Sequence, residues 1–439
     1  MREREQEGTE SRKQVGRDRL RSGLLQPLHP LVGGLPSARF QGPWTPPPRG
    51  EGATSTRWTS LNRVAHGAII APEAREKEHH VENRRSYLLD QRSHGRKVAA
   101  VWPARFPAEL LWAHGFCVSE VWDPPLDRDL SPAHLQPFTC SIVSGGFELL
   151  ASGGTDVADV LVFPHTCDSI QNLATLAKDL LGERRPCLTF YMPKGDQGPR
   201  AATFLAQQLR DLSGQLEQTG ATATDLSMRE ALALGCRRAN LLRELYARRA
   251  EGPLACSNEA FYTAVRGCEF LWPEDAVSRL EALLGLDRHG GAGGVPLVFT
   301  GVLPLPKDLP SVLDGLGVRV VEDDFLGCGR RVCRNEVADG NDFYTTLALR
   351  LLALPPCPTQ GAPVEARLAF LTELVERSAA RGVVFLSLRA CEPDLFERPS
   401  LVAGLKAKGL PVLILETETG ATTPAGMLTR LEAFLEVVA

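Results

Sequence analysis

The sequence has no long apolar run and no excess of basic residues. No stretch approaches the roughly 18 consecutive apolar residues that a membrane span needs, and the basic, polar N-terminus lacks the apolar segment of a secretory signal. The net charge is −4, whereas binding along a nucleic-acid backbone needs clustered positive charge. We therefore expect a cytoplasmic protein that binds neither membranes nor nucleic acid.

Common nucleotide-binding motifs are also missing. The chain contains neither a GxxxxGK[ST] phosphate loop nor a GxGxxG run after a strand. Its Gly-rich pieces, SGGFELLASGGTD at 144–156 and HGGAGG at 289–294, stand in the wrong context, and we interpret them as a helix edge and a linker. This pattern fits a protein that does not itself hydrolyse ATP or bind NAD.

Paired CxxC motifs are absent too, which excludes a zinc ribbon and a ferredoxin-type run. The chain nevertheless has 11 cysteines. This is more than packing requires and far below the density of a disulfide-stapled secreted domain. In a reducing compartment these cysteines are small buried core residues, redox thiols or metal ligands. Their positions in the chain must decide between these three roles.

A chain of 439 residues can form more than one core. Residues 1–90 are charged or rich in Pro and Gly, so we expect a disordered extension or sequence upstream of the true start, with a tail that folds on a partner as the alternative. We expect an N-terminal α/β domain at 91–205, a helical insert at 206–290 and a C-terminal α/β domain at 291–439.

The fold class follows from short β-branched runs that alternate with helical stretches. Continuous apolar strands separated by helices are typical of a parallel sheet covered on both faces. We expect an α/β fold with two Rossmann-like parallel-sheet domains. The expected strands lie in KVAAVWP, ADVLVFPH, CLTFYMPKG, VPLVFTGVLP, VRVVEDDF, GVVFLSLRA and PVLILETETG.

Several cysteines follow these strands directly. Ligands of open parallel sheets collect at the carboxyl ends of the strands. Cys167 and Cys391 follow one expected strand each, and Cys328 and Cys333 both follow VRVVEDDF. The residues alone give equal support to two interpretations, a thiolate metal site and scattered structural cysteines.

A further cysteine, Cys140, lies at an expected helix start with Thr139 as the N-cap, so its thiolate would meet the positive end of the helix dipole. The remaining cysteines that we weighed lie in apolar patterns and are more simply small buried residues: Cys117, Cys187, Cys236 and Cys268.

Ionisable side chains near these positions have two interpretations each. His165 and Asp168 flank Cys167 and could relay protons, or they could bond the local backbone. Glu109 and His114 could point into the same crevice, or they could be ordinary helix-surface residues.

The motifs carry a family resemblance. The pieces that carry it are FPAELLWAHGF, TCSIVSG, VFPHTCDSIQNL, NLLRELYARR, VFTGVLPLP, EDDFLGCGRR, LSLRACEPDLF, GLPVLILETETG and TRLEAFLE, in this order over residues 97–439. The chain resembles the 2-hydroxyacyl-CoA dehydratase D-component family, which also includes subunits similar to those of ATP-dependent benzoyl-CoA reductases.

This resemblance implies a 4Fe-4S cluster held by three cysteines, with one iron open to another ligand, in the crevice between the two domains. By the resemblance the ligands are Cys140, Cys167 and most plausibly Cys391, with Cys328 or Cys333 as alternatives to the third. The candidate catalytic residues nearby are His165, Asp168 and Glu109.

The resemblance also implies the reaction. One electron added to the thioester carbonyl of a 2-hydroxyacyl-CoA gives a ketyl radical that expels the hydroxyl group and acidifies the β position; loss of the β-proton and recovery of the electron then give the enoyl-CoA. The expected partners are the acyl-CoA substrate, a sister subunit or second copy of the chain, and an ATP-dependent activator with its own iron-sulfur cluster. Alternatives are a reductase of an acyl-CoA or small molecule, and a partner subunit without a working cluster.

Overall fold

The computed structural model describes residues 84–124, 129–195, 197–252, 254, 256–286, 294–420 and 422–439. These residues belong to one compact unit. The expectation for residues 1–90 lies outside the described ranges except for 84–90. That short part is ordered instead, because it begins helix α3 (Arg84–Ser93), in which Leu88 is buried.

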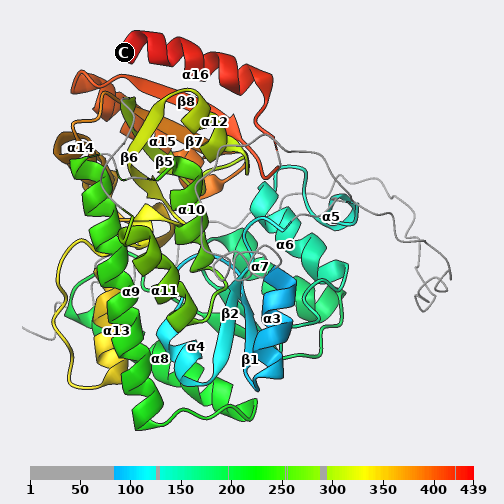
Figure 1. Ribbon diagram of the computed structural model, residues 1–439. Helices are drawn as coiled ribbons and strands as arrows, with labels where there is room; N and C mark the ends of the chain where they lie inside the picture. Colours follow the sequence, from blue (N-terminus) through cyan, green and yellow to red (C-terminus); the bar gives the residue numbers. More distant parts are fainter. Residues whose placement is uncertain are drawn as a thin grey trace, which may run out of the picture. The chain divides into compact units, whose positions relative to one another are not determined.

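Two parallel four-stranded sheets form the framework (Figure 1), so the expected α/β class with two parallel sheets is confirmed. The first sheet has the order β2-β1-β3-β4 and the second β6-β5-β7-β8. The Rossmann-like label stays a prediction. The strands are β1 (Lys97–Val101), β2 (Phe116–Glu120), β3 (Val160–Pro164), β4 (Cys187–Phe190), β5 (Val295–Gly301), β6 (Val318–Phe325), β7 (Gly382–Leu388) and β8 (Val412–Thr417).

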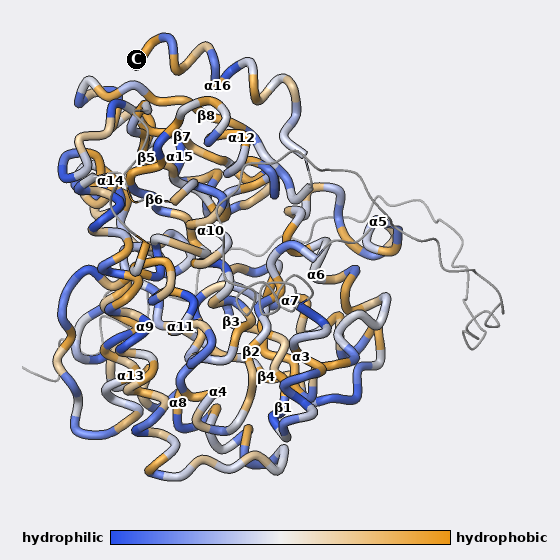
Figure 2. Tube along the Cα trace, in the orientation of Figure 1, coloured by the Kyte–Doolittle hydropathy of each residue, from blue (hydrophilic) through white to orange (hydrophobic). Residues whose placement is uncertain are grey.

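Both faces of each sheet are covered, which explains why the strands are almost continuously apolar. In β1, Ala99 and Val101 belong to one core cluster, while Val98 and Ala100 belong to another. Neighbouring residues of a strand point to opposite faces, so the two clusters lie on the two sides of the sheet. Figure 2 shows the apolar strands of the second sheet in orange.

Helices follow most strands. Those of the first α/β half are α4 (Ala108–Ala113), α5 (Ser131–His134), α6 (Ser141–Ala151), α7 (Asp168–Thr175) and the π-helical η1 (Leu176–Leu180). Those of the second half are α12 (Leu309–Gly315), η2 (Gly329–Arg331), α13 (Phe343–Leu352), η3 (Pro358–Gln360), α14 (Val364–Ser378), α15 (Glu392–Ala407) and α16 (Ala425–Val438). No helix in the described part combines the length and apolar character that crossing a membrane requires.

Between β4 and β5 the described residues form helices without a strand. These helices are α8 (Pro199–Gln218), α9 (Asp225–Glu251), α10 (Asn258–Gly267) and α11 (Pro273–Leu284). Helix α9 contacts α4 of the first half and β6 of the second. The insert therefore links the two halves. Its expected boundaries, like those of the two domains, stay predictions.

The loops at the carboxyl ends of both sheets meet in a shared apolar cluster, which we call the interface cluster. Its buried members come from both halves of the fold: Ala104, Trp122, Ile142, Val302, Leu303, Leu305, Leu326, Cys357 and Leu388. An ion pair between Arg331 and the buried Glu120 joins the two halves beside it. The strand-end loops of the two sheets are thus brought to one place.

Candidate functional site

Cys167 lies at the point where the strand order of the first sheet reverses. Strands β1 and β3 are neighbours in the sheet. The loop after β1 leads to β2 on one side and the loop after β3 leads to β4 on the other, so the two loops diverge and leave a crevice. The two loops contact each other where the amide of Ala104 donates to Thr166 Oγ1 at 2.8 Å. Cys167 follows Thr166 as the N-cap residue of α7.

Cys391 has the corresponding position in the second sheet. There β5 is flanked by β6 and β7, and Cys391 lies just beyond β7 as the N-cap residue of α15. The two sheets therefore each place one cysteine at their own switch point, where ligands of open α/β sheets bind.

Cys140 is itself the N-cap residue of α6, so the expectation that Thr139 caps this helix is wrong. The helix begins one residue later than expected, at Ser141. The consequence for the sulfur is unchanged, because the thiol still lies at the positive end of the helix dipole. All three candidate ligands thus occupy helix N-termini, and all three are partly exposed.

The three thiols lie near one another. Cys140 and Cys391 both pack against the interface cluster, and Cys140 and Cys167 both pack against the core under α6 and α7. Burial raises the pKa of Cys391 well above its usual value, and the charges of Cys140 and Cys167 raise it further. The sulfurs are therefore close enough to sense each other's ionisation.

The surroundings of these sulfurs oppose ionisation of the free thiols. Burial raises the pKa of Cys167, and the charges of Asp168 and Glu392 act in the same direction, while backbone amides at the start of α7 oppose the shift. Three neighbouring thiolates therefore need a cation to balance their charge, and soft sulfur ligands suit iron-sulfur clusters.

A cubane and a single metal ion require different arrangements of their donors. In the described ranges no three His, Cys, Asp or Glu side chains are grouped as they would be around one metal ion. A cubane does not require that arrangement, because each cysteine binds a different iron of the cluster. The residues present are thus compatible with the cluster that the resemblance implies.

A cavity of about 370 Å³ opens beside Cys167. We call it the cysteine-side cavity; it is lined by Thr166, Cys167, Asp168, Lys194, Pro358, Thr359, Ala362, Val364, Glu392, Pro393, Phe396 and Glu397. Asp168 is largely exposed here. Burial raises the pKa of Glu397, and Arg367 opposes the shift. The cavity therefore holds a carboxyl group that retains its proton to higher pH than usual.

His165 lies at the edge of this region. Its Nε2 is 3.5 Å from Asp168 Oδ1, and its ring meets Tyr191 edge-on at 5.4 Å between centroids. Nε2 is buried and forms no hydrogen bond with the part of the chain that is described. His165, Asp168 and Cys167 thus lie together, and their roles stay predictions.

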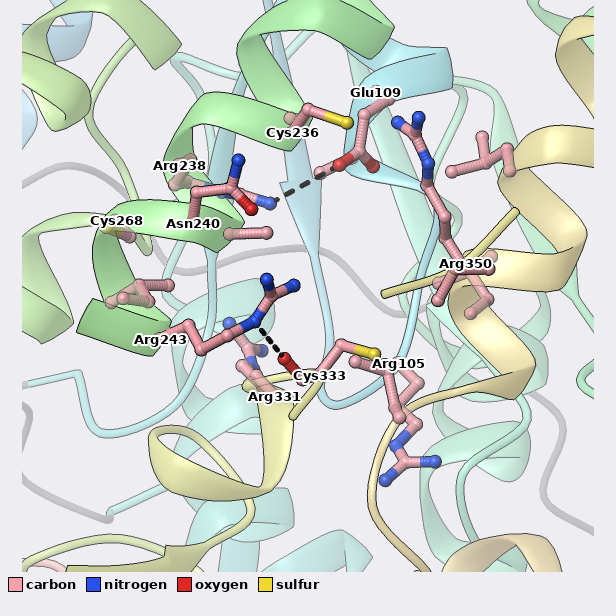
Figure 3. Close-up of a pocket in the computed structure, with 18 of the residues that line it drawn as sticks. Arg105, Glu109, Cys236, Arg238, Asn240, Arg243, Cys268, Arg331, Cys333 and Arg350 are labelled. Carbon is pink, nitrogen blue, oxygen red and sulfur yellow. Dashed lines mark hydrogen bonds and ion pairs between the residues drawn. The ribbon is translucent and has the colours of Figure 1, made fainter. Parts of the chain in front are cut away.

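Glu109 lies elsewhere. It lines a second cavity of about 360 Å³ between α4, α9 and the loop after β6 (Figure 3). Its Oε1 lies 3.7 Å from Arg238, and Gly235 of α9 makes room for it, because a Cβ there would overlap the carboxyl group. No residue that lines this cavity also lines the cysteine-side cavity. The structure therefore separates Glu109 from Cys167.

We call the second cavity the arginine cavity. Its ionisable and sulfur-bearing lining residues are Arg105, Glu109, Glu120, Cys236, Arg238, Arg243, Cys268, Cys328, Arg331, Cys333, Glu336 and Arg350.

The two alternative third ligands, Cys328 and Cys333, line the arginine cavity and not the cysteine-side cavity. Cys328 is also buried in the core formed by α9, α10 and the second sheet. Cys333 donates to the carbonyl oxygens of Asn335 and Ala353 at 3.2 and 3.4 Å. Cys391 is the one of the three that lies with Cys140 and Cys167.

The other cysteines considered above, and His114, are buried or line the arginine cavity. Cys117 and Cys187 are buried, as expected, whereas Cys236 and Cys268 are partly exposed and line the arginine cavity. His114 is buried, with Nδ1 2.8 Å from the carbonyl oxygen of Leu110.

A buried charge network lies next to the interface cluster. Asp324 pairs with Arg330 at 2.9 Å and with Arg367 at 2.6 Å, and Cys357 Sγ lies 3.7 Å from Arg330. Burial raises the pKa of Cys357, but Arg330 and Arg105 more than reverse this, so that its pKa is lowered overall. Two signals in the sequence point to it: the acidic pair in VRVVEDDF, which could serve as caps or salt-bridge partners, and the consecutive arginines in GCGRR.

Comparison with known proteins gives a consistent result. The family model described as 2-hydroxyglutaryl-CoA dehydratase, D-component, matches residues 103–438. Lactoyl-CoA dehydratase subunit beta from Anaerotignum propionicum is 21% identical over 352 residues, 78% of this chain and 92% of that protein.

Two further relatives are similarly distant. (R)-2-hydroxyglutaryl-CoA dehydratase subunit beta from Acidaminococcus fermentans is 22% identical over 360 residues, 80% of this chain and 95% of that protein. A benzoyl-CoA reductase subunit from Thauera aromatica is 25% identical over 328 residues, 72% and 84% of the two chains. The family match spans most of the sequence and confirms the resemblance of the motifs: the chain belongs to the 2-hydroxyglutaryl-CoA dehydratase D-component family of enzyme subunits.

Proposed function

We propose that this chain is the iron-sulfur subunit of a 2-hydroxyacyl-CoA dehydratase, with Cys140, Cys167 and Cys391 as the ligands of a 4Fe-4S cluster. The observation that carries the proposal is the gathering of three thiols at three helix N-termini, drawn from both sheets, in a member of this family. When bound, the cluster would supply one-electron chemistry at a site open to substrate.

The reaction that we propose is the radical dehydration of a 2-hydroxyacyl-CoA to the enoyl-CoA. The β-proton is scarcely acidic in the substrate, so a base alone is insufficient at neutral pH. The side chains that we assign to proton handling lie around the cysteine-side cavity. His165 and Asp168 would hold and pass a proton, and Glu397, with its raised pKa, would carry one near Cys167.

Relatives named as beta subunits support a sister subunit as partner, with a second copy of this chain as the alternative. One-electron activation by an ATP-dependent activator with its own cluster completes the proposal. We further propose a cytoplasmic location.

The second candidate is reduction of an aromatic acyl-CoA. It is favoured by the benzoyl-CoA reductase relative, which is the most identical of the three compared above. This alternative keeps the same three cysteines and changes only the acyl group and the fate of the electron.

An anaerobic assay separates the two candidates. We would combine this chain and its partner subunit with reductant, ATP and the activator, and add lactoyl-, 2-hydroxyglutaryl- or benzoyl-CoA. Formation of an enoyl-CoA, lost in Cys167→Ala and kept in the strand variant Cys187→Ala, is the expected result. Turnover of benzoyl-CoA alone would support the reductase. Equal turnover by wild type and Cys167→Ala would show that this chain is a partner without a working cluster.

A further inference from the structure

The arginine cavity holds more positive charge than its own carboxylates balance. Five arginines and three glutamates line it, an excess of two positive charges. Figure 3 shows Arg243 on α9 and Arg350 on α13 reaching in from opposite sides. Like charges in a shared, partly enclosed space repel each other, so the arrangement costs free energy while the cavity holds no anion.

Two of these arginines have no carboxylate partner within the described ranges. Arg243 donates to the carbonyl oxygens of Cys333 and Asn335, at 3.0 and 3.4 Å. Arg105 donates to Gln360 and to backbone oxygens of Arg330 and Pro355. The charge of Arg243 is therefore available to a ligand, whereas Arg105 already faces the thiol of Cys357.

Arg105 has a second unusual feature. Its side chain is 5% exposed, yet its Nε forms no hydrogen bond to any described residue. Burial lowers the pKa of this guanidinium to about 10. A buried donor without an acceptor is costly, so this group requires a water molecule or a ligand as its acceptor.

The remaining arginines are paired loosely or with exposed groups. Arg350 bonds Asp339, which is largely exposed, and Arg238 lies 3.7 Å from Glu109 while it stacks on Trp112. Only Arg331 is held firmly, by the buried Glu120. Guanidinium groups in such pairs can turn to a stronger anion at little cost.

We propose that the arginine cavity binds a phosphate ester. A phosphoryl group offers several oxygens in tetrahedral directions and two negative charges, which suits donors that approach from α9 and α13. A carboxylate has only two oxygens in one plane. Apolar lining residues would pack against the rest of the ligand: Phe106, Leu242, Val265, Leu347, Leu351 and Leu354.

This inference goes beyond the proposed function. The arginine cavity shares no lining residue with the cysteine-side cavity, so the phosphate site does not depend on the cluster. The phosphate could belong to the coenzyme end of a thioester or to a separate small molecule, because both present the same chemical group.

Calorimetric titration of the full chain tests the proposal. The probes are pyrophosphate, adenosine 3′,5′-bisphosphate, coenzyme A and, as a carboxylate control, succinate. We expect saturable binding of at least one phosphate compound, with Kd raised about tenfold or more in Arg243→Gln. Arg237→Gln is the matched control, because Arg237 lies on the same helix and pairs outside the cavity with Glu281.

Each outcome decides the matter. Coenzyme A binding much more tightly than pyrophosphate would identify the coenzyme as the source, and the reverse would identify a separate small phosphate; both support the site. Absence of phosphate binding, tighter binding of succinate, or equal loss in Arg237→Gln would overturn the proposal. Arg350→Gln replaces Arg243→Gln if that variant does not fold. Cys167→Ala should bind as the wild type does, which keeps this test separate from that of the cluster.

Discussion

At the scale of single residues, the sulfur atoms differ in whether the protein itself stabilises their charge. Cys357 is fully buried, yet Arg330 and Arg105 lower its pKa. Burial raises the pKa of Cys117 to about 12, and it raises the pKa of Cys391 well above the usual value. Cys357 therefore has protein cations as partners, whereas Cys391 would ionise only with help from a bound cation.

The lowered pKa of Cys357 predicts a pH-dependent contribution to stability. The folded state releases this proton more readily than the unfolded state, whose thiol pKa is about 8.5. The contribution is thus fully present above about pH 8.5 and is lost as the pH falls through the folded-state pKa, at about 1.4 kcal/mol for each unit of pKa difference.

The test compares urea unfolding of the wild type and Cys357→Ser from pH 6 to 9. Serine keeps the size and the contact with Thr359 but does not ionise in this range. We expect the stability advantage of the wild type to grow as the pH rises. An advantage that is constant with pH would show that Cys357 stays protonated.

Residue positions could be predicted where a local rule applies. The strand-end positions of Cys167 and Cys391 were predicted because ligands gather beyond the carboxyl ends of parallel strands. Arg105 was not, because its partners come from far along the chain: Gln360 is 255 residues away. Such pairs leave no local spacing to read, and the arginine cavity that they border was missed with them.

At the scale of elements, the turn after β6 depends on one glycine. The amide of Gly329 donates to Asp323 Oδ1 at 2.8 Å, and the same carboxylate accepts hydrogen bonds from the hydroxyls of Tyr246 and Tyr262, each at 2.9 Å. A Cβ at Gly329 would overlap the backbone oxygen of Asp323. This turn places Arg330 beside Asp324 and Arg331 beside Glu120.

Gly329→Ala should therefore destabilise the protein by about 3 kcal/mol or more, because backbone must shift in a packed interior. The control is Gly214→Ala in the middle of α8, where no atom lies within 4 Å of the added Cβ. That change should stabilise the protein by about 0.5 to 1 kcal/mol through its helix propensity. Thermal unfolding of both variants tests this, and similar effects of the two would contradict the account of the turn.

Strand β2 shows where element prediction failed. The segment FCVSE is short and contains two polar residues, so it lacks the apolar run that marked the other strands. All five residues are nevertheless buried. The charge of Glu120 is balanced by Arg331, which is 211 residues away and comes from the other half of the fold. A strand that depends on such a distant partner cannot be recognised from its own composition.

At the scale of the whole molecule, the candidate cluster site needs both halves of the fold. Cys140 and Cys167 follow strands of the first sheet and Cys391 follows a strand of the second, and the interface cluster lies between them. The pair of Glu120 and Arg331 fastens the halves near this site. Their relative position thus decides whether three thiols can share one cluster.

Arg331→Leu should destabilise the protein by about 3 to 5 kcal/mol, because Glu120 is 2% exposed and would keep its charge without this partner. Adding Glu120→Gln should recover much of the loss, since the buried charge is then removed. Urea unfolding of the two single variants and the double variant gives the coupling between them. Additive losses would mean that the pair does not join the halves.

The central claim is that Cys140, Cys167 and Cys391 hold one iron-sulfur cluster. The most direct test is iron and sulfide analysis with an EPR spectrum of the anaerobically purified chain, for the wild type, Cys167→Ala and the control Cys187→Ala. We predict about four irons per chain in the wild type and the control. Cys167→Ala should lose iron and signal while it stays folded. A folded wild type without iron, or a Cys167→Ala variant with the full iron content and an unchanged spectrum, would contradict the claim.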